Sequence, residues 1–130
     1  MTKTHGRSKL TSTGALVKKA RKKRKFELAE PPIETKFGKE KKKIIRTRGG
    51  NHKIKLLTDN KVNVVDKDGN ISQAKIQSVE TNKCSVDYAR RSIITKGAIL
   101  DTDKGFVKVT SRPGQDGIIN GIIVDYKKKK

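Results

Sequence analysis

Closely spaced lysines and arginines dominate the first 55 residues and define the chemistry that is open to this chain. Nineteen of these residues are Lys or Arg and four are acidic, so the segment carries about +15 of the formal net charge of +20. Seven of the eight residues 18–25 are basic. Cations at this density repel one another in the free protein, and a polyphosphate surface removes that repulsion while releasing condensed counterions. The charge distribution therefore favours a nucleic acid as the partner.

Residue types that could support catalysis or metal binding are few and widely spaced. The two histidines, His5 and His52, lie in basic, glycine-flanked surroundings, and Cys84 is the single cysteine. These residues do not form a nucleophile–base set or a cluster of metal ligands. The glycines of residues 114–121 lack the spacing of a phosphate-binding loop, and we interpret them as turn and bulge glycines. We therefore expect no enzymatic activity, no metal and no cofactor.

The basic run fits a nucleic-acid partner better than it fits a solvated face, a short nuclear import signal or a membrane surface. Basic residues continue on both sides of the run, which a solvated face or an import signal does not need. A membrane-surface helix needs a strong apolar face, and residues 15–28 offer only four apolar side chains beyond their alanines. No apolar run reaches the length of a membrane span, and the start of the chain lacks the apolar core of a secretory signal. Together with the lone cysteine, this predicts a soluble cytoplasmic protein in a reducing compartment.

The remainder of the chain has the composition of a small β domain. Residues 56–126 contain ten basic and nine acidic residues, and 17 of their 20 Val, Leu and Ile residues are Val or Ile. Branching at Cβ favours strands over helices. Strand-like runs separated by glycine-bearing turns recur along this part of the chain. They cover residues 43–48, 52–57, 61–66, 71–80, 92–95, 98–102, 106–111 and 118–126.

These patterns predict an all-β fold, a small antiparallel barrel of about six strands with a long extended basic N-terminal arm. We place the arm at residues 1–43, the barrel body at 44–126 and a basic tail at 127–130. The arm could include a short helix over residues 15–28, although like charges at i,i+4 spacing oppose one. Residues 81–91 and 112–117 are predicted to be loops, and Gly121 is predicted to mark a bend or bulge. Nothing in the sequence points to a homo-oligomer.

Scarcity of aromatic residues bears on how a nucleic acid would be recognised. Aromatic side chains make up 4% of the chain, fewer than a protein that stacks single-stranded bases on a sheet would need. Recognition of RNA by shape and backbone is favoured instead. Within Arg48-Gly49-Gly50-Asn51, the glycines would let the backbone approach a phosphate closely while Arg48 and Asn51 donate hydrogen bonds; the alternative is a plain turn between two strands, and the two interpretations are compatible.

Four motifs resemble those of a known family, the small-subunit ribosomal protein eight of the archaeal and eukaryotic type. The motifs are Thr13-Gly14-Ala15 with the basic cluster ending in Glu27-Leu28, then residues 46–51, 88–97 and 110–117. Leu10 and Ala29 depart from the family pattern, which has a basic residue and a glycine there. The similarity spans essentially the whole chain, and the short length resembles the archaeal form. It implies a non-enzymatic structural constituent of the small ribosomal subunit, with a β-barrel body and a basic segment buried in ribosomal RNA beside neighbouring ribosomal proteins.

The predicted RNA-binding residues are the basic residues of the arm, of the first strands and of the later turns, with the Gly-Gly step between the first two strands. They are Arg7, Lys9, Lys18, Lys19, Arg21, Lys22, Lys23, Arg24, Lys25, Lys36, Lys39, Lys41, Lys42, Lys43, Arg46, Arg48, Gly49, Gly50, Asn51, Lys53, Lys55, Arg90, Arg91, Lys96 and Arg112. Two alternatives stay open: a ribosome assembly factor, including an enzyme that would use residues 112–117, and a general nucleic-acid-compacting protein.

Overall fold

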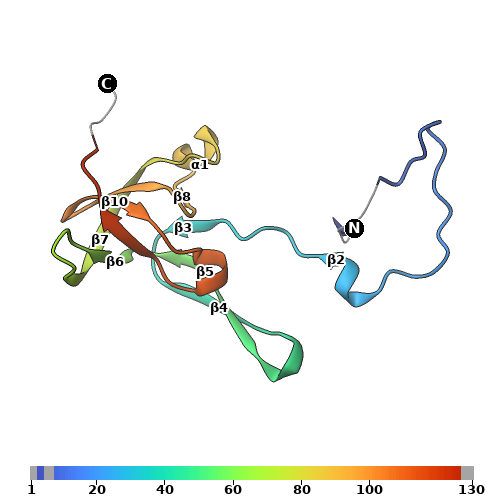
Figure 1. Cartoon of the computed structure of the whole chain (residues 1–130), viewed down its shortest axis with the longest axis horizontal. Coiled ribbons are helices and arrows are strands. Elements are labelled where there is room, and N and C mark those ends of the chain that lie inside the picture. The colour runs from blue at the N-terminus through green and yellow to red at the C-terminus, as the bar shows by residue number, and fades with distance from the viewer. Residues whose placement is uncertain (1–2, 5–7, 127–130) are drawn as a thin grey trace. The chain divides into compact units, whose positions relative to one another are not determined.

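The structure is a computed structural model that describes residues 3–4 and 8–126, and the chain divides into two compact units. The first unit is Met1–Pro32 and the second is Ile33–Lys130. Each unit is described by itself below (Figure 1). Among the described residues, no helix is long and apolar enough to cross a membrane.

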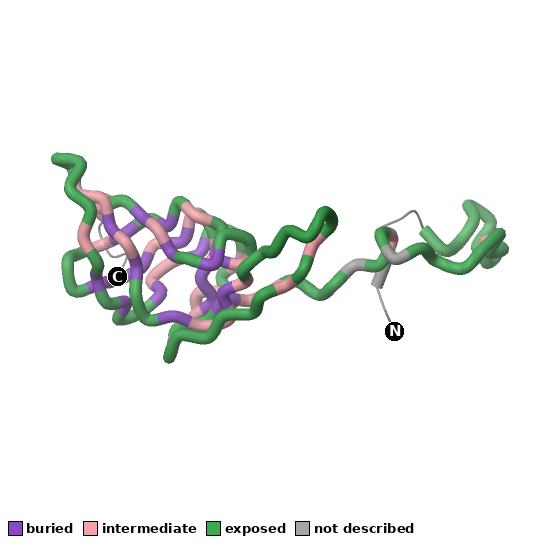
Figure 2. Tube along the Cα trace, turned by 90° about the horizontal axis from the view of Figure 1, so that it is seen from below, coloured by how far each residue is buried: buried purple, intermediate pink, exposed green. Residues whose placement is uncertain are grey.

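The first unit is a loop whose two ends pair. β1 (Lys3–Thr4) and β2 (Leu28–Ala29) are antiparallel, and an isolated bridge joins Leu10 to Leu16. The helix considered for residues 15–28 is reduced to one 3-10 turn, η1 (Lys25–Glu27). Residues 8–24 are exposed, except for half-buried Val17, and the tube of this loop is mostly green in Figure 2. Repulsion between neighbouring cations is the physical reason that this run does not coil into a longer helix.

A closed barrel of five strands forms the centre of the second unit. Its order is β10-β11-β6-β7-β9, and β9 pairs with β10 to close the ring. The strands are β6 (Lys61–Val65), β7 (Ile71–Thr81), β9 (Ile99–Thr102), β10 (Gly105–Val109) and β11 (Asn120–Ile123). The prediction of about six antiparallel strands is therefore corrected, because β11 and β6 run parallel. Strand directions cannot alternate all the way around a ring with an odd number of strands, so one neighbouring pair must be parallel.

Aliphatic side chains from every barrel strand fill the interior. Leu100, Val64 and Val107 have no exposed surface, and Leu56 joins them from outside the barrel. Gly121 is buried, and a Cβ at this position would lie 2.4 Å from Val107 Cγ1 and 2.8 Å from the Lys108 carbonyl oxygen. Close approach between β10 and β11, whose pairing through Gly121 keeps its register, explains this glycine better than the predicted bend or bulge.

A second, four-stranded sheet in the order β4-β5-β3-β8 extends the body. Its strands are β3 (Thr35–Phe37), β4 (Lys41–Arg46), β5 (His52–Asp59) and β8 (Ile93–Ile94). Buried Thr35 donates a hydrogen bond from Oγ1 to the Leu56 carbonyl oxygen at 2.8 Å, which fixes β3 beside β5. In Figure 1 the β4–β5 hairpin projects from the rest of this unit.

The division of the chain into an arm, a body and a tail remains a prediction as a statement about function. Structurally, residues 33–43 contain β3 and the start of β4 and belong to the second unit. The tail at 127–130 lies outside the described residues.

Two short helices correct the all-β prediction. α1 (Val86–Arg90) lies in the segment predicted as a polar loop, and the Ser85 hydroxyl caps it by accepting a hydrogen bond from the Asp87 amide at 3.2 Å. α2 (Pro113–Asp116) has proline in its first turn and ends at Gly117 in the left-handed conformation. Proline suits the first turn, where no amide partner is available, and glycine adopts positive φ at the end without strain.

Candidate nucleic-acid interface

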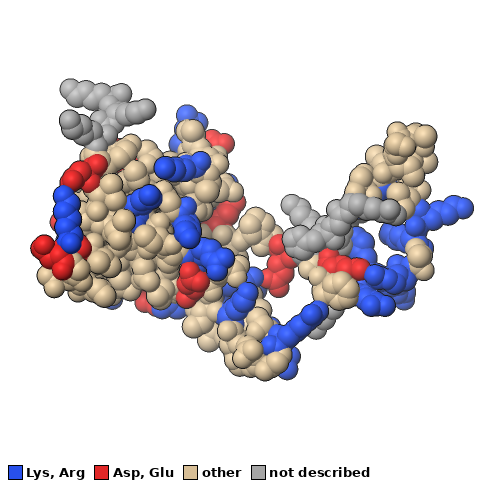
Figure 3. Space-filling model, viewed as in Figure 1, with Lys and Arg blue, Asp and Glu red and all other residues tan. Residues whose placement is uncertain are grey.

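The register of the β4–β5 hairpin gathers lysines on one of its faces. Lys43 lies directly opposite Lys55, and Ile45 lies opposite Lys53. Residues paired in this way share a face of an antiparallel ribbon, so three ammonium groups project to the same side. Like charges placed directly opposite one another destabilise a strand pair. An anionic partner against this face would offset the repulsion between these lysines, and Figure 3 shows Lys and Arg side chains along the hairpin.

The opposite face of the hairpin is partly apolar. Ile44 pairs with Ile54, and Arg46 pairs with His52. Ile44 is 67% exposed. This face becomes core toward its base, where buried Leu56 is opposite Lys42. The Lys42 ammonium lies 2.6 Å from the Glu40 carboxylate, and this hydrogen-bonded pair lowers the pKa of Glu40 and raises the pKa of Lys42.

At the tip of the hairpin, the structure shows the turn geometry of the Gly-Gly step. In η2 (Arg48–Gly50) both glycines have positive φ, 73° and 76°. The Thr47 amide donates to the Asn51 carbonyl oxygen at 2.7 Å, and the Asn51 side-chain amide donates to the Arg48 carbonyl oxygen at 3.4 Å. The glycines are explained by backbone conformation alone, so close approach to a phosphate stays a prediction for this turn.

The loop predicted at residues 112–117 packs against the hairpin as α2. A Cβ on Gly117 would lie 2.6 Å from Ile54 Cγ2, so this contact requires glycine. Lys53 Nζ donates to Gln115 Oε1 at 3.3 Å across the same junction. The Arg112 amide donates to the Asp116 carboxylate at 2.8 Å and holds the first turn of α2. Residues 53–54 of the hairpin and residues 112–117, which are far apart in the sequence, thus pack against each other.

Lysines around the base of the sheet are also brought together. Lys36 of β3 and Lys41 of β4 both pair with Thr58 of β5, one from each side. Thr58 Oγ1 also donates a hydrogen bond to the Lys39 carbonyl oxygen. The side chains of all three lysines are exposed.

Two of the predicted residues in and after α1 lie beside carboxylates of this chain. Arg91 forms an ion pair with Glu34, and Arg90 lies 3.9 Å from Asp87. Lys96 is exposed in the turn between β8 and β9. These carboxylates offset part of the local positive charge, so we rank this group below the hairpin.

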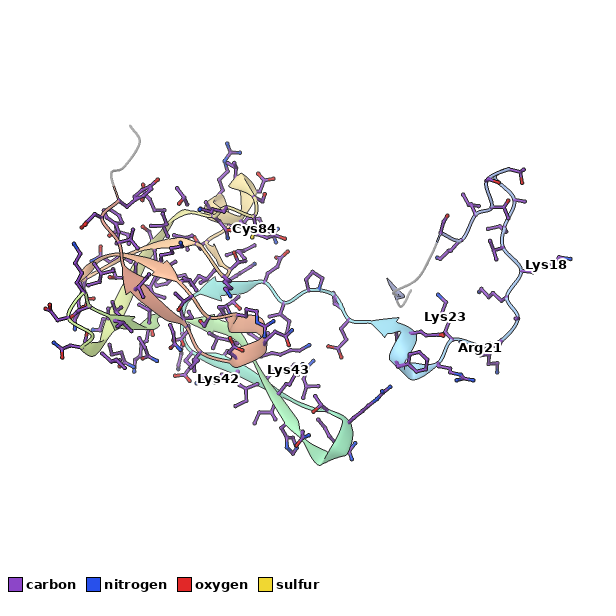
Figure 4. All side chains as sticks on the ribbon, viewed as in Figure 1. Lys18, Arg21, Lys23, Lys42, Lys43 and Cys84 are labelled. Carbon is purple, nitrogen blue, oxygen red and sulfur yellow. The ribbon has the colours of Figure 1, made fainter. Side chains whose placement is uncertain are left out.

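In the first unit, the described basic side chains from Lys9 to Arg24 are all exposed. Figure 4 shows Lys18, Arg21 and Lys23 on this loop. Arg21 forms an ion pair with Glu27, with 2.5 Å between Nη2 and Oε1. The hydrogen bond from Arg21 is the main cause that lowers the pKa of Glu27, and the same bond raises the pKa of Arg21. Arg7 and the side chain of Lys25 lie outside the described residues.

One further pair of lysines was not among the predicted site residues. Exposed Lys61 of β6 lies directly opposite exposed Lys75 of β7. The sequence contains no local signal for this pair, because 14 positions separate the two residues and only the register of the strands brings them together.

Cys84 is exposed between β7 and α1, with Sγ 3.5 Å from Thr95 Oγ1. In the part of the chain that the structure describes, no group of three or more His, Cys, Asp or Glu residues could hold a metal ion.

The described residues form a small basic β-barrel protein with a lysine-faced hairpin and a highly basic N-terminal unit, an arrangement suited to a polyanionic partner. Comparison with known families is more specific. Residues 4–124 match the model of the family described as Ribosomal protein S8e, and the chain belongs to that family. It is therefore a structural ribosomal protein and not an enzyme, which confirms the resemblance found in the sequence motifs.

Curated relatives cover nearly the same length. Each is described as small ribosomal subunit protein eS8, and the matches span 92% of this chain. The protein of Methanococcoides burtonii is 46% identical and is covered over 97% of its length. Those of Nanoarchaeum equitans and Methanobrevibacter smithii are both 48% identical, covered over 94% and 96% of their lengths.

Proposed function

We propose that this chain is a constituent of the small subunit of the cytoplasmic ribosome, where it binds and stabilises ribosomal RNA beside neighbouring ribosomal proteins. Two surfaces make the contacts. One is the basic run of the first unit between Lys9 and Lys25, and the other is the β4–β5 hairpin with the lysines at its base. The family and the names of its curated relatives support the assignment to the small subunit.

The observation that carries the proposal is a cluster of like charges that the fold itself creates. Lys43 and Lys55 are opposed in the register of the hairpin, with Lys53 on the same face. Internal carboxylates are too few to neutralise the segment, which has nineteen basic and four acidic residues up to position 55. One of those four acids, Glu34, pairs outside the segment with Arg91. Phosphate groups supply the missing negative charge.

Recognition is expected to act on the RNA backbone and its shape. Residues 41–59, which contain the hairpin, include no Phe, Tyr or Trp, so the hairpin lacks the large aromatic rings of a sheet that stacks single-stranded bases. A two-stranded ribbon with lysines on one side can follow a phosphate backbone, and each contact then replaces condensed counterions. Holding RNA segments at a fixed spacing is the structural role that follows.

The salt dependence of binding tests this proposal. The full chain is titrated with small-subunit ribosomal RNA, and with duplex DNA of equal length, at several concentrations of monovalent salt. For ribosomal RNA the logarithm of the association constant should fall with the logarithm of salt by about 0.7–0.9 for each phosphate contact. Tighter binding to ribosomal RNA supports the proposal. Equal affinity for both polymers supports a general compacting protein instead, and a slope near zero rules out both.

A further inference from the structure

Glu27 occupies an unusual position beside the basic run of the first unit. It is the first acidic residue of the chain, and seven of the eight residues 18–25 are basic. Its carboxylate accepts hydrogen bonds from both terminal nitrogens of Arg21, at 3.2 Å and 2.5 Å, and from the Arg24 amide at 3.0 Å. Its own amide donates to the Arg24 carbonyl oxygen at 3.0 Å. One carboxylate therefore holds both the side chain and the backbone of this run.

We propose that Glu27 is a positioning residue that holds residues 21–27, which end in the 3-10 turn η1, as a preformed phosphate-binding turn. This inference rests on the proposed function, because it concerns how the same basic segment binds RNA. The two-pronged contact fixes the Arg21 guanidinium, which also donates to the Lys22 carbonyl oxygen at 3.2 Å. With the backbone held at Lys22 and Arg24, the side chains of these two residues leave the turn from fixed points and are exposed.

Long-range electrostatics alone would select against an acid here. A carboxylate beside a polycation lowers the local positive potential and weakens attraction to phosphate. Preorganisation has the opposite effect, since side chains ordered before binding need not lose that freedom on the RNA. Arginine is well suited to hold the turn in place, because its planar guanidinium fork matches the two carboxylate oxygens of Glu27.

The positioning role and the change in net charge predict opposite changes in RNA affinity for one substitution. Glu27→Gln raises the formal net charge from +20 to +21 and removes the charged partner of Arg21. Charge alone predicts tighter binding to small-subunit ribosomal RNA. Loss of the preformed turn predicts binding weaker by about threefold to tenfold, the loss expected when one or two side chains must be ordered on the RNA. Glu40→Gln is the matched control, because it changes the charge equally and breaks the pair with Lys42 on the hairpin.

Affinities of wild type, Glu27→Gln, Glu40→Gln, Arg21→Lys and the double variant Arg21→Lys/Glu27→Gln are compared with the same RNA. Arg21→Lys keeps the charge but loses the planar fork. If the two residues act as a unit, the double variant binds no more weakly than the weaker single variant. The Arg24 amide resonance should also shift in Glu27→Gln, while the resonances of the barrel stay unchanged.

Each outcome separates the inference from the proposed function. Weaker binding by Glu27→Gln, with Glu40→Gln at or above wild-type affinity, supports the positioning role. Glu27→Gln binding as tightly as wild type, or Glu40→Gln losing as much affinity, overturns it while leaving RNA binding intact. Failure of the wild-type chain to bind ribosomal RNA would instead refute the proposed function.

Discussion

Replacing Lys43 by glutamine should stabilise the folded protein and weaken its binding to RNA. In the free protein the substitution removes the repulsion between Lys43 and the directly opposed Lys55. Such a cross-strand pair, with Lys43 exposed and Lys55 half-buried, is worth on the order of a few tenths of a kcal/mol. The midpoint of urea denaturation should therefore rise slightly. On RNA the same substitution removes one phosphate contact.

The loss of that contact has a measurable size. The slope of log affinity against log salt should become shallower by about 0.7–0.9. Between about 50 and 200 mM salt, the affinity advantage of wild type over the variant should then shrink by about threefold. Fluorescence anisotropy with labelled ribosomal RNA measures the slope, and Lys104→Gln, which removes an exposed lysine outside the predicted interface, is the control of equal charge change. A slope equal to that of the control, or a lower denaturation midpoint, would refute the reasoning.

Three further predictions concern packing, the basic run and protonation. Gly117→Ala should lower the free energy of unfolding by about 1–3 kcal/mol in a urea titration, because residue 117 has positive φ and its new Cβ would overlap Ile54 of β5. Gly50 also has positive φ, but a Cβ there would meet nothing within 4 Å, so Gly50→Ala should lower the free energy of unfolding by only about 1 kcal/mol. Replacing all four residues 22–25 by glutamate should abolish binding to ribosomal RNA while the circular dichroism of the barrel is retained, and wild-type affinity in this variant would show that the run is not an anchor. Glu27 should titrate below the ordinary range of a glutamate, so its contact with Arg21 is present at neutral pH and is lost as the pH falls through the depressed pKa; a carboxyl carbon resonance that titrates at the usual glutamate pKa would contradict this.

The sequence predicted the strands of this protein well where the pattern was local. The predicted strands at 52–57, 61–66 and 71–80 agree with β5, β6 and β7 to within a few residues. Alternation and β-branching act within one strand and need no knowledge of its neighbours. The concentration of basic residues in the first 55 positions can likewise be seen in the sequence without a structure.

Features that depend on distant partners could not be predicted in the same way. The parallel pairing of β11 with β6 depends on how many strands close the ring. β3 spans only three residues and exists because buried Thr35 bonds to β5. The opposition of Lys43 and Lys55 required the register of the hairpin.

Two helices, in contrast, had local signals that could have been used. Pro113 and Gly117 have the spacing of a helix start and end, and Ser85 precedes α1 as a capping residue. Their flanking glycines and polar residues suggested loops instead. Helices this short bury too little surface to produce an apolar periodicity.

Crosslinking of protein to RNA in intact cells, with identification of the attached peptides and RNA fragments, tests the central claim most directly. We predict crosslinks to small-subunit ribosomal RNA from peptides of residues 9–25 and 41–55. Crosslinks confined to other faces of the chain, or recovery of RNA unrelated to the ribosome, would contradict the account.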